Sequence, residues 1–408
     1  DATFYILPPF LTDSLPGIWR YGTWPMFEII SGEGHELGSH TLNHPDLTQL
    51  PVGDTLTPNT IIYELFHSKR MIDEKITDRN CITFAYPYGL HNNLIDSLTS
   101  IFYESARAIG QQHNPWSPQN LDWFRLSSYE VHFDEPRNTL NDDLPELYEF
   151  MNWIENSIST QSFSIQLAHE VVPQSELADL LSQGSRFPIS NEWLELLCDW
   201  LKSKSDDGEV WIESVANITK YIKERDNYFY NILSQTNNEI QINLSDNLPD
   251  EIYNYPLTAY ITVPTDWQYV LIEQGTETNL VESFLMDTVN VVLADIIPDG
   301  GTIFVSKFEP NLVADDENNS PDDFILFQNY PNPFNPETRI EFQTLKPSFI
   351  QLIVYDVLGN EISRLVNEYK PIGKYNFVFN GNELVSGIYI YVLKAEDVVI
   401  SKKMILMK

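Results

Sequence analysis

Hydrophobic residues recur every three to four positions in several stretches of the first half of the chain. This is the spacing of one face of a helix, as in the run of Ile61, Leu65 and Ile72. It predicts helices over residues 26–31, 57–76, 92–102, 144–157, 191–204 and 214–226. Short apolar runs between them predict buried strands over residues 1–6, 81–86, 105–109, 163–168 and 209–213. Helices that alternate with strands are typical of an α/β barrel, so we predict a barrel-like domain over residues 1–228.

After residue 228 the pattern changes to short strands of alternating polarity, separated by Pro, Asn, Asp and Gly. The predicted strands are 239–244, 257–263, 267–272, 288–294 and 301–306. We predict a small immunoglobulin-like β-sandwich over residues 229–312, an acidic linker over 313–323, and a second all-β sandwich over 324–408.

Composition narrows the possible partners. The formal net charge is -35, and the 24 Lys and Arg residues are scattered, so the chain lacks the basic stripe that binds nucleic acid. Hydrophobic residues make up 42% of the chain, which excludes general disorder. No apolar run reaches the roughly 20 residues that a transmembrane helix needs. Cys81 and Cys198 are both predicted to be buried, unpaired thiols rather than a disulfide.

Three histidines lie close together near the N-terminus, at His35, His40 and His44. His40 and His44 are four residues apart, and on a helix that spacing lets both imidazoles reach one divalent metal; the alternative is a surface pair without a ligand. His35 is followed by Glu36 but not by a second His at the spacing of a zinc protease, so we expect it to be a hydrogen-bonded core residue.

Two further sites follow predicted strands. The turn Pro87-Tyr88-Gly89 comes directly after the strand at 81–86 and can aim a backbone N–H outward, as an oxyanion hole requires, although a simple tight turn would look the same. His169 ends the strand at 163–168, and catalytic side chains gather at the carboxyl ends of barrel strands.

The order of these motifs and the residues within them resemble those of the polysaccharide deacetylase family, the NodB-homology domain of carbohydrate esterase family 4. The resemblance implies a distorted (β/α) barrel and metal-assisted hydrolysis of N-acetyl groups on a GlcNAc-type polysaccharide, an amide hydrolase activity. It implies that His40 and His44 bind a divalent metal, most simply zinc, and that the backbone N–H of Tyr88 binds the oxyanion. It also implies that Pro87 contacts substrate, and that His169 protonates the leaving amine.

The sequence departs from the family at several positions. Asp122-Trp123 is only similar to a family motif whose Trp lines the sugar groove, so Trp123 could equally be a core residue. Ala85 stands where the family often has an Arg that braces the catalytic carboxylate. The family's third metal ligand and its general base are two Asp residues of a Thr-Phe-Asp-Asp-Gly motif that this sequence lacks, and Asp1 is not placed to replace either.

These departures lead to an expectation and two alternatives. We expect that the chain lacks the first strand of its barrel, binds metal weakly and is inactive as given, whereas a longer protein would be active. The alternatives are an acetyl-ester substrate such as acetylated xylan, and a non-catalytic surface protein that binds glycans.

The C-terminal sequence resembles the type A sorting domain of type IX secretion. The resemblance rests on residues 327–336, 354–359, 386–391 and the basic end at 401–408. It implies contact with the secretion machinery and export across the outer membrane of a Gram-negative bacterium, to the medium or the cell surface. An ordinary adhesion module is the alternative.

Overall fold

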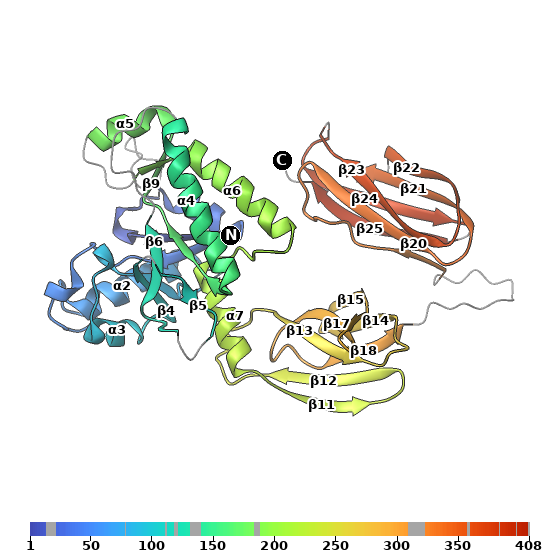
Figure 1. The fold of residues 1–408 in the computed structure, drawn as a ribbon, viewed down its shortest axis with the longest axis horizontal. Coiled ribbons are helices and arrows are strands. Elements are labelled where there is room, and N and C mark those ends of the chain that lie inside the picture. The colour runs from blue at the N-terminus through green and yellow to red at the C-terminus, as the bar shows by residue number, and fades with distance from the viewer. Residues whose placement is uncertain are drawn as a thin grey trace.

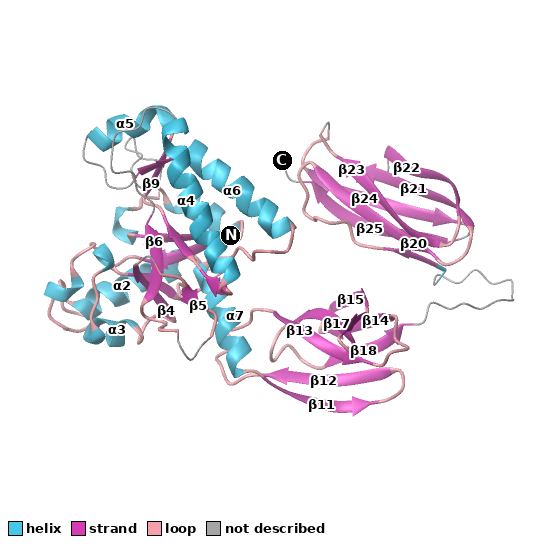
Figure 2. Cartoon of the chain, in the orientation of Figure 1, coloured by secondary structure: helices cyan, strands magenta, loops and turns pink. Residues whose placement is uncertain are grey.

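A computed structural model shows one α/β region followed by regions built of strands (Figure 1). It describes residues 1–13, 22–77, 79–110, 112–117, 121–130, 140–182, 188–308, 323–356, 360–382, 384–396 and 398–406, without the side chains of 140–146 and 280. Figure 2 shows that the helices are confined to the α/β region. The predicted change of pattern after residue 228 agrees with this division, because α7 (Val215–Asn227) is followed directly by β11 (Phe229–Gln235).

The α/β region is built on one curled, fully parallel sheet of six strands. In order across the sheet they are β1 (Thr3–Ile6), β2 (Glu36–Ser39), β3 (Thr83–Ala85), β4 (Ser105–Ile109), β6 (Leu126–Glu130) and β8 (Ile165–Leu167). Two small pairs complete the region, β5 (Asn114–Pro115) with β7 (Ser162–Phe163), and β9 (Glu170–Val172) with β10 (Pro188–Ser190). The strand predicted at 209–213 is wrong, because that segment has no regular secondary structure and pairs with no strand among the described residues.

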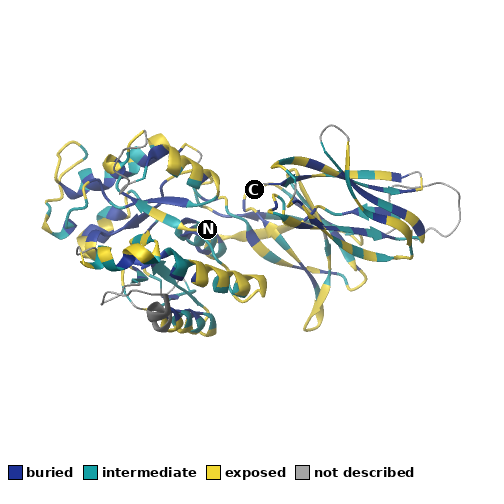
Figure 3. Cartoon of the chain, turned by 90° about the horizontal axis from the view of Figure 1, so that it is seen from above, coloured by how far each residue is buried: buried dark blue, intermediate teal, exposed yellow. Residues whose placement is uncertain are grey.

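Helices pack against the sheet through apolar faces. One hydrophobic core joins the strands to α1 (Trp24–Gly32), α2 (Ile61–Lys75) and α3 (Asn93–Thr99), and includes Leu37, Leu65 and Phe84. Buried residues accordingly follow the strands in Figure 3, and exposed ones cover the outer helix surfaces.

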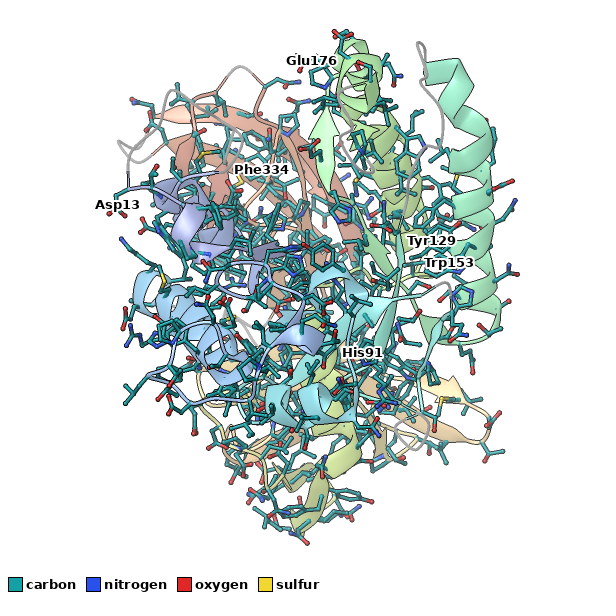
Figure 4. All side chains as sticks on the ribbon, turned by 90° about the vertical axis from the view of Figure 1, so that its left-hand side faces the viewer. Asp13, His91, Tyr129, Trp153, Glu176 and Phe334 are labelled. Atoms are coloured by element: carbon teal, nitrogen blue, oxygen red, sulfur yellow. The ribbon has the colours of Figure 1, made fainter. Side chains whose placement is uncertain are left out.

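A second core joins α4 (Leu140–Ser159), α5 (Gln174–Ser182) and α6 (Asn191–Asp206). Tyr129 of β6 packs on this core, with its ring 4.9 Å from that of Trp153 (Figure 4). Helix starts follow the sequence: the side chains of Asn92 and Ser190 accept hydrogen bonds from the first free N–H groups of α3 and α6.

The middle region consists of a five-stranded and a three-stranded sheet that share one hydrophobic core. Its strands after β11 are β12 (Glu239–Ser245), β13 (Leu257–Val263), β14 (Tyr269–Gln274), β15 (Glu277–Glu282), β16 (Phe284–Met286), β17 (Val289–Ile296) and β18 (Ile303–Phe308). The sequence pattern missed β11, β15 and β16. The apolar residues of β11 and β16 are largely exposed, so these two strands show no clean alternation.

The C-terminal region pairs a three-stranded sheet with a four-stranded one around a single core. The strands are β19 (Phe324–Leu326), β20 (Glu337–Thr344), β21 (Ser348–Asp356), β22 (Glu361–Lys370), β23 (Gly373–Asn380), β24 (Gly387–Ala395) and β25 (Val398–Leu406). No helix in the described ranges is long and apolar enough to cross a membrane. Both cysteines are free, as predicted, but only Cys81 is buried; Cys198 is exposed on α6, which corrects the prediction for that thiol.

Candidate active site

The candidate site lies at the edge of the sheet where the parallel strands end. His40 follows β2, the turn η3 (Pro87–Gly89) follows β3, and His169 comes two residues after β8. Because all strands run in the same direction, their carboxyl ends share one edge, where ligands of α/β sheets usually bind. The structure thus places five of the six site residues predicted from sequence on this edge: His40, His44, Pro87, Tyr88 and His169.

His40 and His44 meet directly, with their Nε2 atoms 3.1 Å apart. The segment that joins them is not helical, which corrects the geometry expected from their spacing. Instead Thr41 and His44 adopt left-handed backbone angles, with φ of 71° and 57°. The Thr41 hydroxyl accepts a hydrogen bond of 2.9 Å from the backbone N–H of His44, which closes the turn.

The protonation of His40 is fixed by its surroundings. Its Nδ1 lies 2.8 Å from the carbonyl oxygen of Ala85, which can only accept, so Nδ1 carries the proton and Nε2 keeps a lone pair. Burial, and secondarily the charge of Arg107, lowers the pKa of His40 to about 3. Burial also lowers the pKa of His44. Both rings are therefore neutral near pH 7, the form in which imidazole binds metals.

The pair fits two ligands of one metal ion. A tetrahedral ion separates two bound imidazole nitrogens by about 3.4 Å, close to the 3.1 Å found here. The Ala85 carbonyl orients His40 in the way that outer hydrogen bonds orient metal-binding histidines. Among the residues that the structure describes, no group of three or more His, Cys, Asp or Glu side chains could complete such a site.

Tyr88 adds a strained turn to the site. Its φ of 58° is unusual for a residue with a large side chain, and such strain clusters at functional sites. The ring is exposed and lies 4.7 Å from that of His44. Pro87 is buried beneath it and fixes the start of the turn.

His169 lies near the pair and has a carboxylate partner. Its Nδ1 is 3.2 Å from Oε1 of Glu130, the last residue of β6. Burial lowers the pKa of His169, and the charges of Arg107 and His44 lower it further. The imidazole is therefore neutral near pH 7 in the free chain, and Glu130 is placed to stabilise the ring once it takes up a proton.

Arg107 was missed by the sequence reasoning. It lies on β4 in direct register with Ala85 of β3, and it is only 4% exposed. An arginine inside the apolar run of residues 105–109 was the available signal, because arginine is rarely buried without a function or a partner.

Residues 1–102 match the polysaccharide deacetylase family. The site just described is thus built largely within the deacetylase match, with Arg107, Glu130 and His169 beyond its end. Residues 328–407 match the secretion system C-terminal sorting domain. This sorting domain directs the chain to export, to the cell surface or the medium.

Known proteins resemble the chain at low identity. A gellan lyase from Bacillus sp is 23% identical over 319 residues, which are 74% of this chain, and the chain spans 12% of the length of that relative. A polysaccharide deacetylase from Bacillus cereus is 17% identical, covering 31% of this chain and 35% of that one, with a TM-score of 0.24. A de-N-acetylase from Aggregatibacter actinomycetemcomitans is 15% identical, covering 34% of this chain and 63% of that one, with a TM-score of 0.25.

Trp123 is not brought to the site of the deacetylase region. Its carbonyl accepts a hydrogen bond of 2.7 Å from Ala106 near the start of β4, and its ring lies 5.2 Å from the Lys223 ammonium. These contacts lie at the amino edge of the sheet, opposite the histidines. Trp123 therefore packs where α7 meets the sheet.

Asp1 and His35 also lie at the amino edge. The N–H of Ala2 donates to Nδ1 of His35 at 3.0 Å, and the Asp1 carboxylate is next to Gly34. His35 is thus hydrogen-bonded as predicted, although it is only half-buried. Neither side chain is near the pair of His40 and His44, which lies at the opposite edge of the sheet.

Proposed function

We propose that the chain is a secreted, metal-dependent polysaccharide deacetylase that hydrolyses N-acetyl groups of a GlcNAc-type glycan. The observation that carries the proposal is the pair of neutral imidazoles, His40 and His44, whose Nε2 atoms converge to 3.1 Å at the carboxyl edge of a parallel sheet. The match of residues 1–102 to the polysaccharide deacetylase family supports the same reaction.

His40 and His44 would hold the divalent ion, for which zinc is the simplest choice given two imidazole ligands. When bound, such an ion polarises the acetyl carbonyl and lowers the pKa of a bound water. Because the described residues add no carboxylate ligand beside the pair, we expect weak metal binding and little or no turnover by this chain.

The protein's own groups would share the remaining work. The backbone N–H of Tyr88 would donate to the oxyanion, with Pro87 shaping the contact to substrate. His169 would protonate the leaving amine, and the nearby Glu130 carboxylate would stabilise its charged form. We propose that residues 1–228 carry this activity and that the C-terminal region, through the secretion machinery, delivers it outside the cell.

Two other functions remain as alternatives. The same groups could hydrolyse an acetyl ester such as acetylated xylan, because neither the imidazole pair nor the Tyr88 turn distinguishes an ester from an amide. The lack of a third ligand among the described residues favours, instead, a non-catalytic glycan-binding protein.

Acetate release tests the proposal. The full chain is incubated with zinc and either N-acetylated chitooligosaccharide or acetylated xylan, alongside a His44→Ala variant. We expect little acetate release from the amide substrate by this chain, and we expect the residual release to require zinc and to be lost in the variant. Acetate release from acetylated xylan alone favours the ester hydrolase. Binding of a glycan without acetate release favours the non-catalytic glycan-binding protein. Release that His44→Ala leaves unchanged contradicts the assigned site.

A further inference from the structure

Arg107 is a buried cation whose Nε has no hydrogen-bonding partner among the described residues. Its side chain is 4% exposed, and its Nε donates to no atom that the structure describes. Buried polar groups are nearly always paired, and leaving one unpaired destabilises the fold. The Nε of Arg107 therefore needs an acceptor that the described residues do not supply.

The sheet is shaped to let this side chain reach the site. Arg107 is in register with Ala85, and Tyr5 on β1 is in register with Gly38 on β2. Partners in register on parallel strands point to the same face. Because Ala85 and Gly38 present almost no side chain, Arg107 extends across two strands until its guanidinium lies 5.2 Å from the centre of the Tyr5 ring. A Cβ on Gly38 would come within 2.5 Å of the Tyr5 ring, so the tyrosine lies directly over this glycine.

Within the described part of the chain, the guanidinium makes no ion pair, and the acidic groups that act on it are Tyr5 and Glu130. The Glu130 carboxylate acts on Arg107 through space, but no ion pair joins them among the described residues, and Glu130 lies against His169 instead. His40 hydrogen-bonds the carbonyl of Ala85, the residue over which Arg107 extends. The charge of Arg107 lowers the pKa of His40, His44 and His169, so its field reaches all three rings.

We propose that Arg107 forms a binding site for one carboxylate group, beside His40 and His169 and distinct from the metal-binding pair. The planar guanidinium presents parallel N–H donors that match the two oxygens of a carboxylate. Two sources share this chemistry: free acetate, which is the product if the proposed deacetylase function holds, and the carboxylate of a uronic acid in a glycan.

Binding to the full chain, in metal-free buffer without substrate, tests the site. Calorimetry compares sodium acetate, sodium glucuronate and neutral acetamide, with sodium chloride matching the ionic strength. We expect acetate or glucuronate to bind at least about tenfold more tightly than acetamide, because an ionised acceptor strengthens each hydrogen bond. The tighter of the two carboxylates identifies the source.

Variants locate the site on Arg107. Arg107→Lys keeps the charge but loses the paired donors, and we expect it to weaken carboxylate binding about tenfold. Arg125→Lys is the matched control, because Arg125 is a half-exposed arginine that pairs with Asp96 just before β6, at the amino edge of the sheet. Carboxylate binding by this variant should not change. Equal binding of acetate and acetamide, or no carboxylate binding by the unmodified chain, overturns the proposal. Since no turnover is measured, that failure is separate from failure of the proposed reaction.

Discussion

The two faces of the parallel sheet are made by the same strands but are stabilised in opposite ways. One face carries Ile6, Leu37 and Phe84, which pack against α1, α2 and α3 in a continuous apolar core. The other carries Thr3, Glu36, Thr83, Ser105 and Arg107, and α7 covers part of it. Burial of apolar surface stabilises the first face, whereas the second depends on each polar group finding a partner.

Within the polar face, pairing separates structural from functional residues. Glu36 accepts hydrogen bonds from the hydroxyls of Thr3 and Thr83 and from the N–H of Ala216, and so ties three strands to α7. Arg107 is equally buried but has no such bonds among the described residues. The satisfied Glu36 stabilises the fold, whereas the unsatisfied Nε of Arg107 supports the proposed carboxylate site.

The largest effect is expected on the apolar face. Phe84→Ala removes a fully buried ring and should lower the free energy of unfolding by about 3–5 kcal/mol. Phe4→Ala on β1 is the control. Because Phe4 is 38% exposed, this substitution should lower the free energy of unfolding far less. Hydrogen exchange of peptides from β2 to β4 in the full chain measures both. Equal losses would show that this face is not the main source of stability.

On the polar face, Glu36→Leu should destabilise by about 2–4 kcal/mol, because it leaves the Ala216 N–H and two hydroxyls without their acceptor. The same hydrogen-exchange measurement applies. A neutral or stabilising result would mean that this hydrogen-bond network is not needed for stability.

The pH dependence of Glu36 gives an independent check. Burial raises the pKa of Glu36 above its ordinary value of 4.5. The folded state therefore holds a proton that the unfolded state has lost, and this contribution to stability falls as the pH rises from about 4.5 through the raised pKa. Glu36→Gln should remove that part of the pH dependence. An unchanged profile in the variant would contradict the direction of the shift.

A smaller loss of stability is expected at Gly38 on the polar face, where the absence of a side chain leaves room for the Tyr5 ring. Gly38→Ala places a methyl group against the Tyr5 ring and should destabilise by about 1–3 kcal/mol, while also weakening carboxylate binding at Arg107. Gly32→Ala is the control, because a Cβ there meets nothing within 4 Å. If Gly38→Ala leaves both stability and binding intact, Arg107 does not depend on this gap.

The smallest effect concerns the strained turn. Tyr88→Gly relieves a left-handed backbone and should stabilise the fold by about 0.5–1 kcal/mol, whereas Tyr88→Ala loses the ring but keeps the strain. Urea unfolding of the two variants compares them directly. Stabilisation by alanine alone would show that the ring, not the backbone, is under strain.

Local patterns predicted most of the α/β region but not the contacts between strands. Spacing gave the helices over 144–157 and 191–204, and alternation of elements gave the parallel arrangement. The turn at Thr41 was missed, because a left-handed residue other than glycine leaves no mark in the sequence. Arg107 was missed because only the strand register places it beside Ala85. Trp123 could not be placed, since a sequence does not show at which edge of a sheet a loop lies.

Zinc binding to the full chain tests the central claim most directly. Competition against a chromogenic chelator measures the affinity and stoichiometry of zinc binding for the unmodified chain and for His40→Ala. The control is His67→Ala, because the His67 ring lies on α2 and is hydrogen-bonded to the carbonyl of Thr55. The account predicts a single weak zinc site per chain, lost in His40→Ala and kept in His67→Ala. Zinc binding that His40→Ala leaves unchanged, or no binding by the unmodified chain, would contradict the assignment of the imidazole pair as the metal site.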